Sequence, residues 1–275
     1  MENLADALRQ GGIDVSSLAL LFETAQEKVH ELIVPGTEAI DLWRRLRART
    51  EQTGHWPVLL GGDDRVKRLQ ESVRWMTAMK TEMIRKDAAT IDPAEWFENR
   101  YLDEIDELKH AAIEADSPKK ELYWSGLLTA DDSFRWLPQG PWPEGTSVAR
   151  QFSIPIDSGR NEPLPRVHVA LLPTVHGWQA PAFLRFGAWG KCPSPGENAA
   201  LMKYWGDRHG AEVVGIAGNV VELRVLSPPR DRDAALALAR EQYLYCQDIV
   251  TQSVQTLQRL AATLLDGGVW SFWWD

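Results

Sequence analysis

Two carboxylates near the carboxyl end of the chain have a spacing that suits ligand binding. Glu241 and Asp248 are seven positions apart in a segment with helical periodicity, which places them near one helix face, with Tyr245 beside them. We predict a polar pocket between this helix, Arg185 and the loop that follows Arg185. The alternative is a buried Arg185–carboxylate pair that only orients the helix on a sheet.

The loop expected beside this pocket runs from Trp189 to Cys192. Cys192 lies just before an expected helix start at Pro195, and a helix N-terminus can lower the pKa of a thiol. His168 or His176 could act as a base for this thiol, but no spacing ties these residues together, so we favour a small semi-buried side chain that fixes the loop into the helix. The predicted binding residues are Arg185, Trp189, Cys192, Trp205, Glu241, Tyr245 and Asp248.

Other residue types that often carry chemistry form no motif. The six histidines contain no His-Glu-x-x-His pair and no close cysteine, so no metal site is predicted. Gly61-Gly62 follows an expected strand and precedes a helix, but Asp63 and Asp64 would repel a phosphate there. No cofactor and no catalytic residue are predicted, which favours a binding protein over an enzyme.

The charge of the chain limits its partners. The net charge of −9 argues against a nucleic-acid backbone, which needs a basic face, and against anionic membrane surfaces. The basic cluster Arg44, Arg45, Arg47 and Arg49 is expected on a solvated helix face. A basic protein partner is compatible with this charge, because an acidic surface speeds the encounter.

Cysteine and tryptophan usage indicates the compartment and the core. Two cysteines 54 positions apart, with no signal peptide, predict a reducing cytoplasm. No apolar run approaches the roughly 18 residues that a membrane span needs. The 13 tryptophans are spread from Trp43 to Trp274 and are expected to fill the core of several elements, with ligand stacking as the alternative.

The C-terminal region is well punctuated into elements that would position the site residues. A capping box at Ser194–Glu197 opens a helix that ends at Gly210, and Gly218-Asn219 supplies the turn of a hairpin. The expected strands are residues 167–172, 182–186, 211–217, 220–226 and 269–275, with two helices after Asp231. This order predicts an α+β fold with a ferredoxin-like β-α-β-β-α-β unit, built on an antiparallel or mixed sheet, over residues 166–275.

Two further expectations concern the ends of the chain. Trp270, Phe272 and Trp274 would point to one side of the last strand and Trp273 to the other, which predicts an interior strand. Residues 1–145 are expected to form a helix-rich α+β region with a helical hairpin at 64–116, followed by a linker at 146–165. An apolar stripe from Val66 to Met83 on one long helix would pack internally or form a seam between copies.

Three C-terminal motifs carry a family resemblance. They are Phe186-Gly187-Ala188-Trp189 with Cys192-Pro193-Ser194-Pro195, Ala235–Tyr243 with Tyr245–Val250, and the closing Trp270–Asp275. Residues 164–275 resemble a bacterial family known as domain of unknown function 4253, with Gln247 as a small departure where a proline is expected. The resemblance implies no activity, and by analogy with other such bacterial families it is compatible with an immunity protein for a secreted toxin.

Together these features predict a cytoplasmic bacterial protein that binds another protein without catalysis. The alternative is a small-molecule-binding protein or an enzyme with a pocket near Cys192, Glu241 and Asp248. A third hypothesis is a structural role through the stripe from Val66 to Met83.

Overall fold

A computed structural model describes the chain except residues 1, 77, 115–136 and 146–150. The chain divides into two compact units, each described by itself. The first unit comprises Met1–Thr90, Arg150–Ser227 and Gly268–Asp275. The second comprises Ile91–Ala149 and Pro228–Gly267. This division differs from the predicted one at residues 146–165, because strands from both ends of the chain share the sheet of the first unit.

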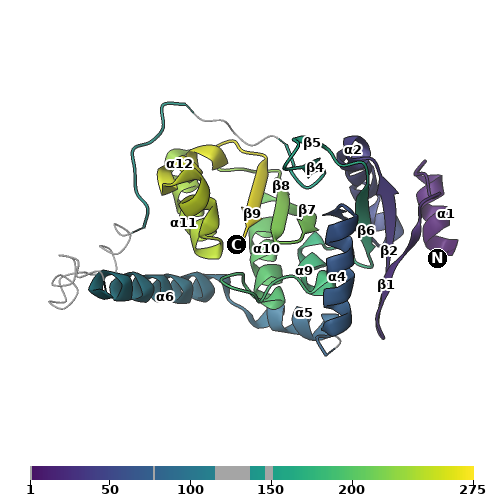
Figure 1. The fold of residues 1–275 in the computed structure, drawn as a ribbon, viewed down its shortest axis with the longest axis horizontal. Helices are drawn as coiled ribbons and strands as arrows, with labels where there is room; N and C mark the ends of the chain where they lie inside the picture. Colours follow the sequence, from purple (N-terminus) through teal and green to yellow (C-terminus); the bar gives the residue numbers. More distant parts are fainter. Residues whose placement is uncertain (1, 77, 115–136, 146–150) are drawn as a thin grey trace. The chain divides into compact units, whose positions relative to one another are not determined.

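The first unit is organised around a mixed sheet with the order β1-β2-β6-β3-β7-β8-β9 over the described residues (Figure 1). Its strands are β1 (Ala19–Glu23), β2 (Lys28–Val34), β3 (Trp56–Gly61), β6 (Val167–Leu172), β7 (Ala211–Ala217), β8 (Val220–Val225) and β9 (Val269–Trp273). All neighbouring pairs are antiparallel except β3 and β7, which are parallel. The predicted α+β class is confirmed.

The ferredoxin-like detail of the prediction is not confirmed. β3, from the N-terminal region, lies between β6 and β7, so the C-terminal strands do not form a sheet of their own. Val169 of β6 is paired with Leu32 on one side and with Leu59 on the other. The hairpin of β7 and β8 forms as predicted, with its turn at Gly218-Asn219.

The last strand is not interior. β9 pairs with β8 and ends the sheet among the described strands. Trp270, Phe272 and Trp274 are buried on one face, whereas Val269 and Trp273 are half-buried on the other. The alternation of large apolar residues therefore reflects one covered face.

Helices lie on both faces of this sheet. They are α1 (Glu2–Gln10), α2 (Gly36–Arg47), α3 (Thr50–Thr53), α4 (Asp63–Trp75), α5 (Thr81–Thr90), η1 (Gly177–Gln179), α9 (Ala180–Leu184) and α10 (Pro195–His209). Leu8 of α1 and Trp43 of α2 share a core with Leu32 and Val169. Side chains that alternate with these along the strands, such as Leu60, point to the other face of the sheet, toward α4 and α9. The two-stranded pair β4 (Ile156–Asp157) and β5 (Glu162–Pro163) completes this unit.

Three predicted elements differ in the structure. The segment 182–186, expected as a strand, is mostly helix α9, because Pro181 starts a helical turn. The stripe from Val66 to Met83 does not lie on one helix, since α4 ends at Trp75 and Met83 belongs to α5. The expected hairpin at 64–116 is instead three helices, and the third belongs to the second unit.

The regular elements described in the second unit are all helices. Its elements are α6 (Pro93–Glu114), α11 (Arg232–Tyr245), the π-helix η2 (Ile249–Val254) and α12 (Leu257–Leu264). Glu104 of α6 accepts hydrogen bonds from the Tyr243 hydroxyl, at 2.8 Å, and from Gln247. Burial, together with the adjacent Glu104 charge, raises the pKa of Tyr243. In neither unit does a described helix have the length and apolar character to cross a membrane.

Candidate functional site

Arg185 occupies an unusual backbone position at the end of α9. It caps this helix in the left-handed region, with φ of 55° and ψ of 37°, where glycine is the usual residue. A side chain there costs roughly 1–2 kcal/mol. Arg185 is nevertheless buried, with 5% of its surface exposed. Strain of this kind persists where the surrounding contacts hold the residue in place.

The contacts of Arg185 leave part of its guanidinium without an acceptor. Nη1 donates to Thr81 Oγ1 at 2.6 Å and to the carbonyl oxygens of Ala182 and Phe183. Thr81 Oγ1 in turn donates to Glu27 Oε2 at 2.8 Å, which connects the cation to a carboxylate through a hydroxyl. Nε is buried and has no hydrogen-bond acceptor among the described residues. Burial lowers the pKa of Arg185, and the Glu27 charge raises it.

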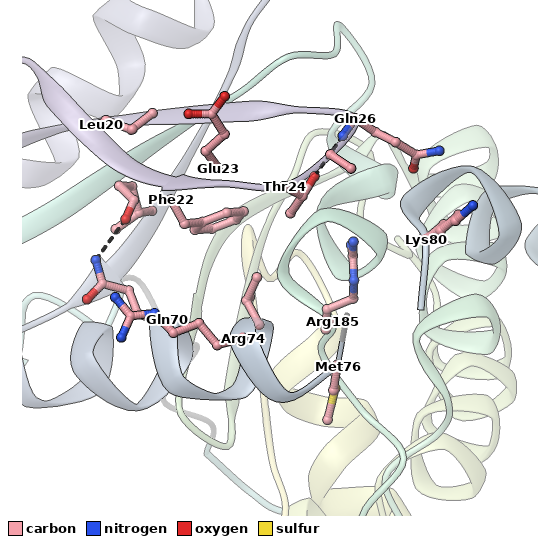
Figure 2. A pocket seen from close by; sticks show the side chains of 13 residues that line it. Leu20, Phe22, Glu23, Thr24, Gln26, Gln70, Arg74, Met76, Lys80 and Arg185 are labelled. Atoms are coloured by element: carbon pink, nitrogen blue, oxygen red, sulfur yellow. Dashed lines mark hydrogen bonds between the residues drawn. The ribbon is translucent and has the colours of Figure 1, made fainter. Parts of the chain in front are cut away.

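Arg185 lies at one end of a groove between β1 and α4 (Figure 2). The groove has a volume of about 600 Å³. Its lining comes from three separate parts of the chain: Leu20, Leu21, Phe22, Glu23, Thr24, Ala25 and Gln26; Gln70, Val73, Arg74, Met76 and Lys80; and Arg185. We call this cavity the β1–α4 groove.

The β1–α4 groove combines apolar walls with positive charge. Leu20 is 46% exposed, a large fraction for a leucine in a strand. Arg74, Lys80 and Arg185 line the groove, and the carboxylate in its lining, Glu23, is paired with Lys28 at 3.1 Å. The groove is therefore locally basic although the whole chain has a net charge of −9.

The strand beside the groove is not an open template for another strand. Residues on either side of Leu21 shift register against β2, so Leu21 occupies a bulge. Its carbonyl oxygen accepts a hydrogen bond from Gln70 Nε2 of α4 at 2.8 Å (Figure 2). Because a bulge and a side-chain bond occupy the strand edge, we expect recognition in the groove through side chains.

The structure divides the predicted site residues between the two units. Arg185, Trp189, Cys192 and Trp205 belong to the first unit, and Glu241, Tyr245 and Asp248 belong to the second. Arg185 and Trp189 both line a second cavity, of about 260 Å³. Cys192 and Trp205 line neither cavity.

The surroundings of the other predicted residues indicate structural roles. Trp205 is fully buried and stacks on Phe272, with ring centroids 5.6 Å apart. Tyr245 is buried in the second unit. Glu241 and Asp248 do not share a helix, because α11 ends at Tyr245 and the next residue has an extended backbone. The predicted common face for the two carboxylates is therefore wrong.

His168 is held between two carboxylates. Its Nδ1 is 2.6 Å from Glu31 Oε2, and its Nε2 is 2.7 Å from Asp63 Oδ1. Burial lowers the His168 pKa, but the hydrogen bonds and charges of Glu31 and Asp63 outweigh burial, so the net shift is upward. Both ring nitrogens are occupied by different carboxylates, and no cluster of metal-ligating side chains is found in the described part of the chain.

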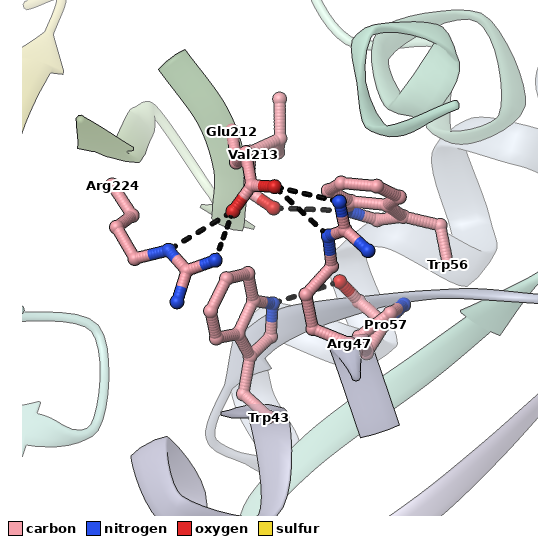
Figure 3. Close-up of polar contacts among 7 residues, drawn as sticks. All are labelled: Trp43, Arg47, Trp56, Pro57, Glu212, Val213 and Arg224. Atoms are coloured by element: carbon pink, nitrogen blue, oxygen red, sulfur yellow. Dashed lines mark hydrogen bonds and ion pairs between the residues drawn. The ribbon is translucent and has the colours of Figure 1, made fainter. Parts of the chain in front are cut away.

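A second polar cluster holds α2 against the sheet (Figure 3). Glu212 accepts hydrogen bonds from Arg47 Nε at 3.0 Å and Nη2 at 2.7 Å, and from Arg224 Nε at 2.9 Å. The Arg47 and Arg224 guanidinium carbons lie 4.3 and 5.0 Å from the ring centroids of Trp56 and Trp43. The expected solvated face is therefore wrong for Arg47, which forms a structural ion pair.

Sequence reasoning found Arg185 but missed the groove around it. The β1–α4 groove joins residues 20–26, 70–80 and 185, which no local pattern connects. The exposed Leu20 and the bulge at Leu21 follow from strand pairing, and pairing cannot be read from one sequence.

Comparisons with known proteins identify the C-terminal region. Residues 168–275 match the family described as a domain of unknown function, number 4253. Neither the curated proteins nor the solved structures gave a match.

Proposed function

We propose that this chain, whose residues 168–275 carry the domain of unknown function 4253, is a non-catalytic protein-binding module that uses the β1–α4 groove. The observation that carries the proposal is the combination of apolar walls with Arg185, a buried cation whose Nε has no acceptor in the described part of the chain. Such groups gain most from a partner that brings both apolar surface and an acceptor.

The occupant that fits the groove is an acidic and apolar segment of a partner protein. Leu20, Phe22 and Met76 offer apolar contact, while Arg74 and Lys80 attract a carboxylate. The net charge of −9 favours a partner that is basic elsewhere, since long-range attraction speeds the encounter. By analogy with other bacterial families of this kind, the partner class is a secreted toxin that an immunity-like protein neutralises.

We place this function in the bacterial cytoplasm. Cys192 and Cys246 are both buried, and neither forms a disulfide with a described residue, which is the usage expected of a reducing compartment. The family resemblance supports a bacterial source.

The test is affinity capture with three baits: the wild-type protein, Leu20→Asp and Leu226→Asp. Leu20 lines the groove, whereas Leu226, which is 59% exposed, lies outside the groove in the same unit and serves as the matched control. We expect one stoichiometric protein to be retained by the wild type and by Leu226→Asp, lost from Leu20→Asp, and released by high salt.

Two results would contradict the proposal. Equal retention by all three baits would show that the partner binds elsewhere on the chain. An empty wild-type bait would argue against a protein-binding function altogether. Circular dichroism of the three baits checks that the added carboxylate has not unfolded the chain.

A further inference from the structure

The second cavity at Arg185 lies on the other side of α4 from the β1–α4 groove. It has a volume of about 260 Å³. Leu60 of β3 and Ile216 of β7 line it, together with α4 residues, the segment 184–189 and the turn at Gly218-Asn219. We call it the hairpin cavity. All of its lining residues belong to the first unit.

The charged side chains that line the hairpin cavity are all arginines. They are Arg65, Arg68 and Arg185, and no carboxylate of the described residues shares this lining. Arg65 Nη1 and Arg68 Nε each donate to a backbone carbonyl oxygen at 3.3 Å, those of Ala217 and Asp64. In the described part of the chain neither arginine forms an ion pair. Burial raises the pKa of Glu222 and the nearby Arg65 charge opposes that rise, so one buried carboxylate lies near Arg65. The three cations around this small cavity still repel one another, which favours an anion among them.

Carboxylates on the outer side of α4 do not remove this charge. Arg65 and Arg68 also border a shallower cavity that contains Asp63, Asp64 and Asp157. Asp63 is engaged by His168 at 2.7 Å and by Arg166 at 3.3 Å. Asp64 and Asp157 face that outer cavity and are absent from the lining of the hairpin cavity.

Arg185 is the buried cation of this cluster, and it also lines the β1–α4 groove. It is 95% buried, since 5% of its surface is exposed, and its Nε has no acceptor among the described residues. A buried donor of a charged group that has no acceptor destabilises the fold. Glu27 already acts on this guanidinium through Thr81, and an anion in the adjoining cavity would add negative charge beside it.

The remaining walls suit a planar ring. Trp189 is half-buried in the lining, and Phe186 holds it edge-on, with ring centroids 5.0 Å apart. Gly187 fixes this loop: its φ is +116°, and a Cβ there would lie 2.0 Å from Pro193 O. Ser72 adds a hydroxyl whose hydrogen-bond contact, to Met76 Sδ, is long at 3.9 Å.

We propose that the hairpin cavity binds a small phosphate ester that carries a planar ring. Arg65 and Arg68 contact the phosphate, Arg185 provides the buried positive charge beneath it, and Trp189 packs on the ring. The ligand is distinct from the protein segment proposed for the β1–α4 groove, although both proposals use Arg185.

The test is calorimetric titration of the full chain at low salt with phenyl phosphate, inorganic phosphate and benzyl alcohol as probes. The variants are Arg68→Gln and Lys67→Gln. Lys67 lies on the same helix, is exposed, and lines neither cavity, so its variant removes the same charge without touching the site. Arg185 is left unchanged because replacing it would disturb the core.

Phenyl phosphate is expected to bind most tightly, inorganic phosphate more weakly, and benzyl alcohol not at all. Arg68→Gln is expected to weaken phenyl phosphate by about tenfold, as for one lost charge-assisted hydrogen bond, and Lys67→Gln by less than about twofold. No binding of phenyl phosphate at millimolar concentration, or equal weakening by both variants, would overturn the site. Equal affinity for phenyl phosphate and inorganic phosphate would overturn the role of Trp189.

Discussion

Replacing Glu212 with glutamine tests whether the cluster of Figure 3 holds α2 on the sheet. The wild-type carboxylate accepts from two arginines, one on each oxygen. Glutamine keeps the shape but offers one acceptor and turns an NH₂ group toward one guanidinium. Arg47 and Arg224 would then be two cations without the charge that joins them.

The size of the effect follows from exposure. Two unit charges about 4 Å apart attract by about 4 kcal/mol at an effective dielectric constant near 20. Solvent reduces this value, because the side chains of Arg47, Glu212 and Arg224 are 28%, 12% and 33% exposed. Exposed pairs contribute about 0–1 kcal/mol, and breaking a buried pair costs about 3–5 kcal/mol. For this half-buried cluster we expect Glu212→Gln to cost about 2–3 kcal/mol of unfolding free energy.

The assay is urea unfolding followed by tryptophan fluorescence, since Trp43 and Trp56 lie under the two guanidinium groups. In thermal unfolding, each 1 kcal/mol lowers the Tm of a unit of this size by about 2–4 °C, so a fall of about 5–10 °C is expected. The control is Asp41→Asn, which breaks an exposed pair with Arg44 on the same helix. A Glu212→Gln variant as stable as Asp41→Asn would refute the argument that this cluster holds α2.

Two further predictions concern His168 and the cysteines. Because the folded-state pKa of His168 is raised above 6.5, its protonation stabilises the fold below that pH, and this contribution disappears as pH rises through the folded pKa. Between about pH 6 and about pH 8, the urea midpoint of the wild type should therefore decrease more than that of His168→Gln. Parallel plots of urea midpoint against pH for the two proteins would contradict this prediction. Cys192 and Cys246 are 5% and 1% exposed, so both should resist a thiol reagent until urea unfolds the chain. Rapid labelling of the native protein would instead support a reactive thiol.

The sequence predicted those elements whose signals are local. The Ser194 hydroxyl accepts a hydrogen bond from the Glu197 backbone N–H, and the Glu197 carboxylate accepts one from the Ser194 backbone N–H, as the capping box predicted. Gly210 ends that helix in the left-handed region with φ of 59°. The β7–β8 hairpin also forms where its turn residues indicate. In each case the residues that decide the structure lie within one or two turns of chain.

The prediction failed where distant segments decide. Strand pairing across about 140 residues joins β2 to β6, and the register is set by the faces that become buried, not by a local motif. Residues 182–186 are apolar over too short a run to distinguish helix from strand, and Pro181 decides for helix. Arg47 was assigned to solvent because its partner, Glu212, lies 165 positions away.

The same limit explains why net charge did not reveal the cationic sites. A charge of −9 describes the far field of the chain, which governs encounter with large charged partners. At physiological salt the screening length is about 8 Å, so a group inside a cavity responds mainly to its own walls. The walls of the hairpin cavity carry Arg65, Arg68 and Arg185. Excluding an extended nucleic-acid backbone, which needs a broad basic face, therefore does not exclude one small phosphate ester.

Arg185 also lines the β1–α4 groove. An anion bound in one cavity would neutralise part of the Arg185 charge and so weaken the attraction of a second anion to the other cavity. The two proposed ligands are thus expected to oppose each other's binding, and titrating phenyl phosphate in the presence of the captured partner measures that coupling.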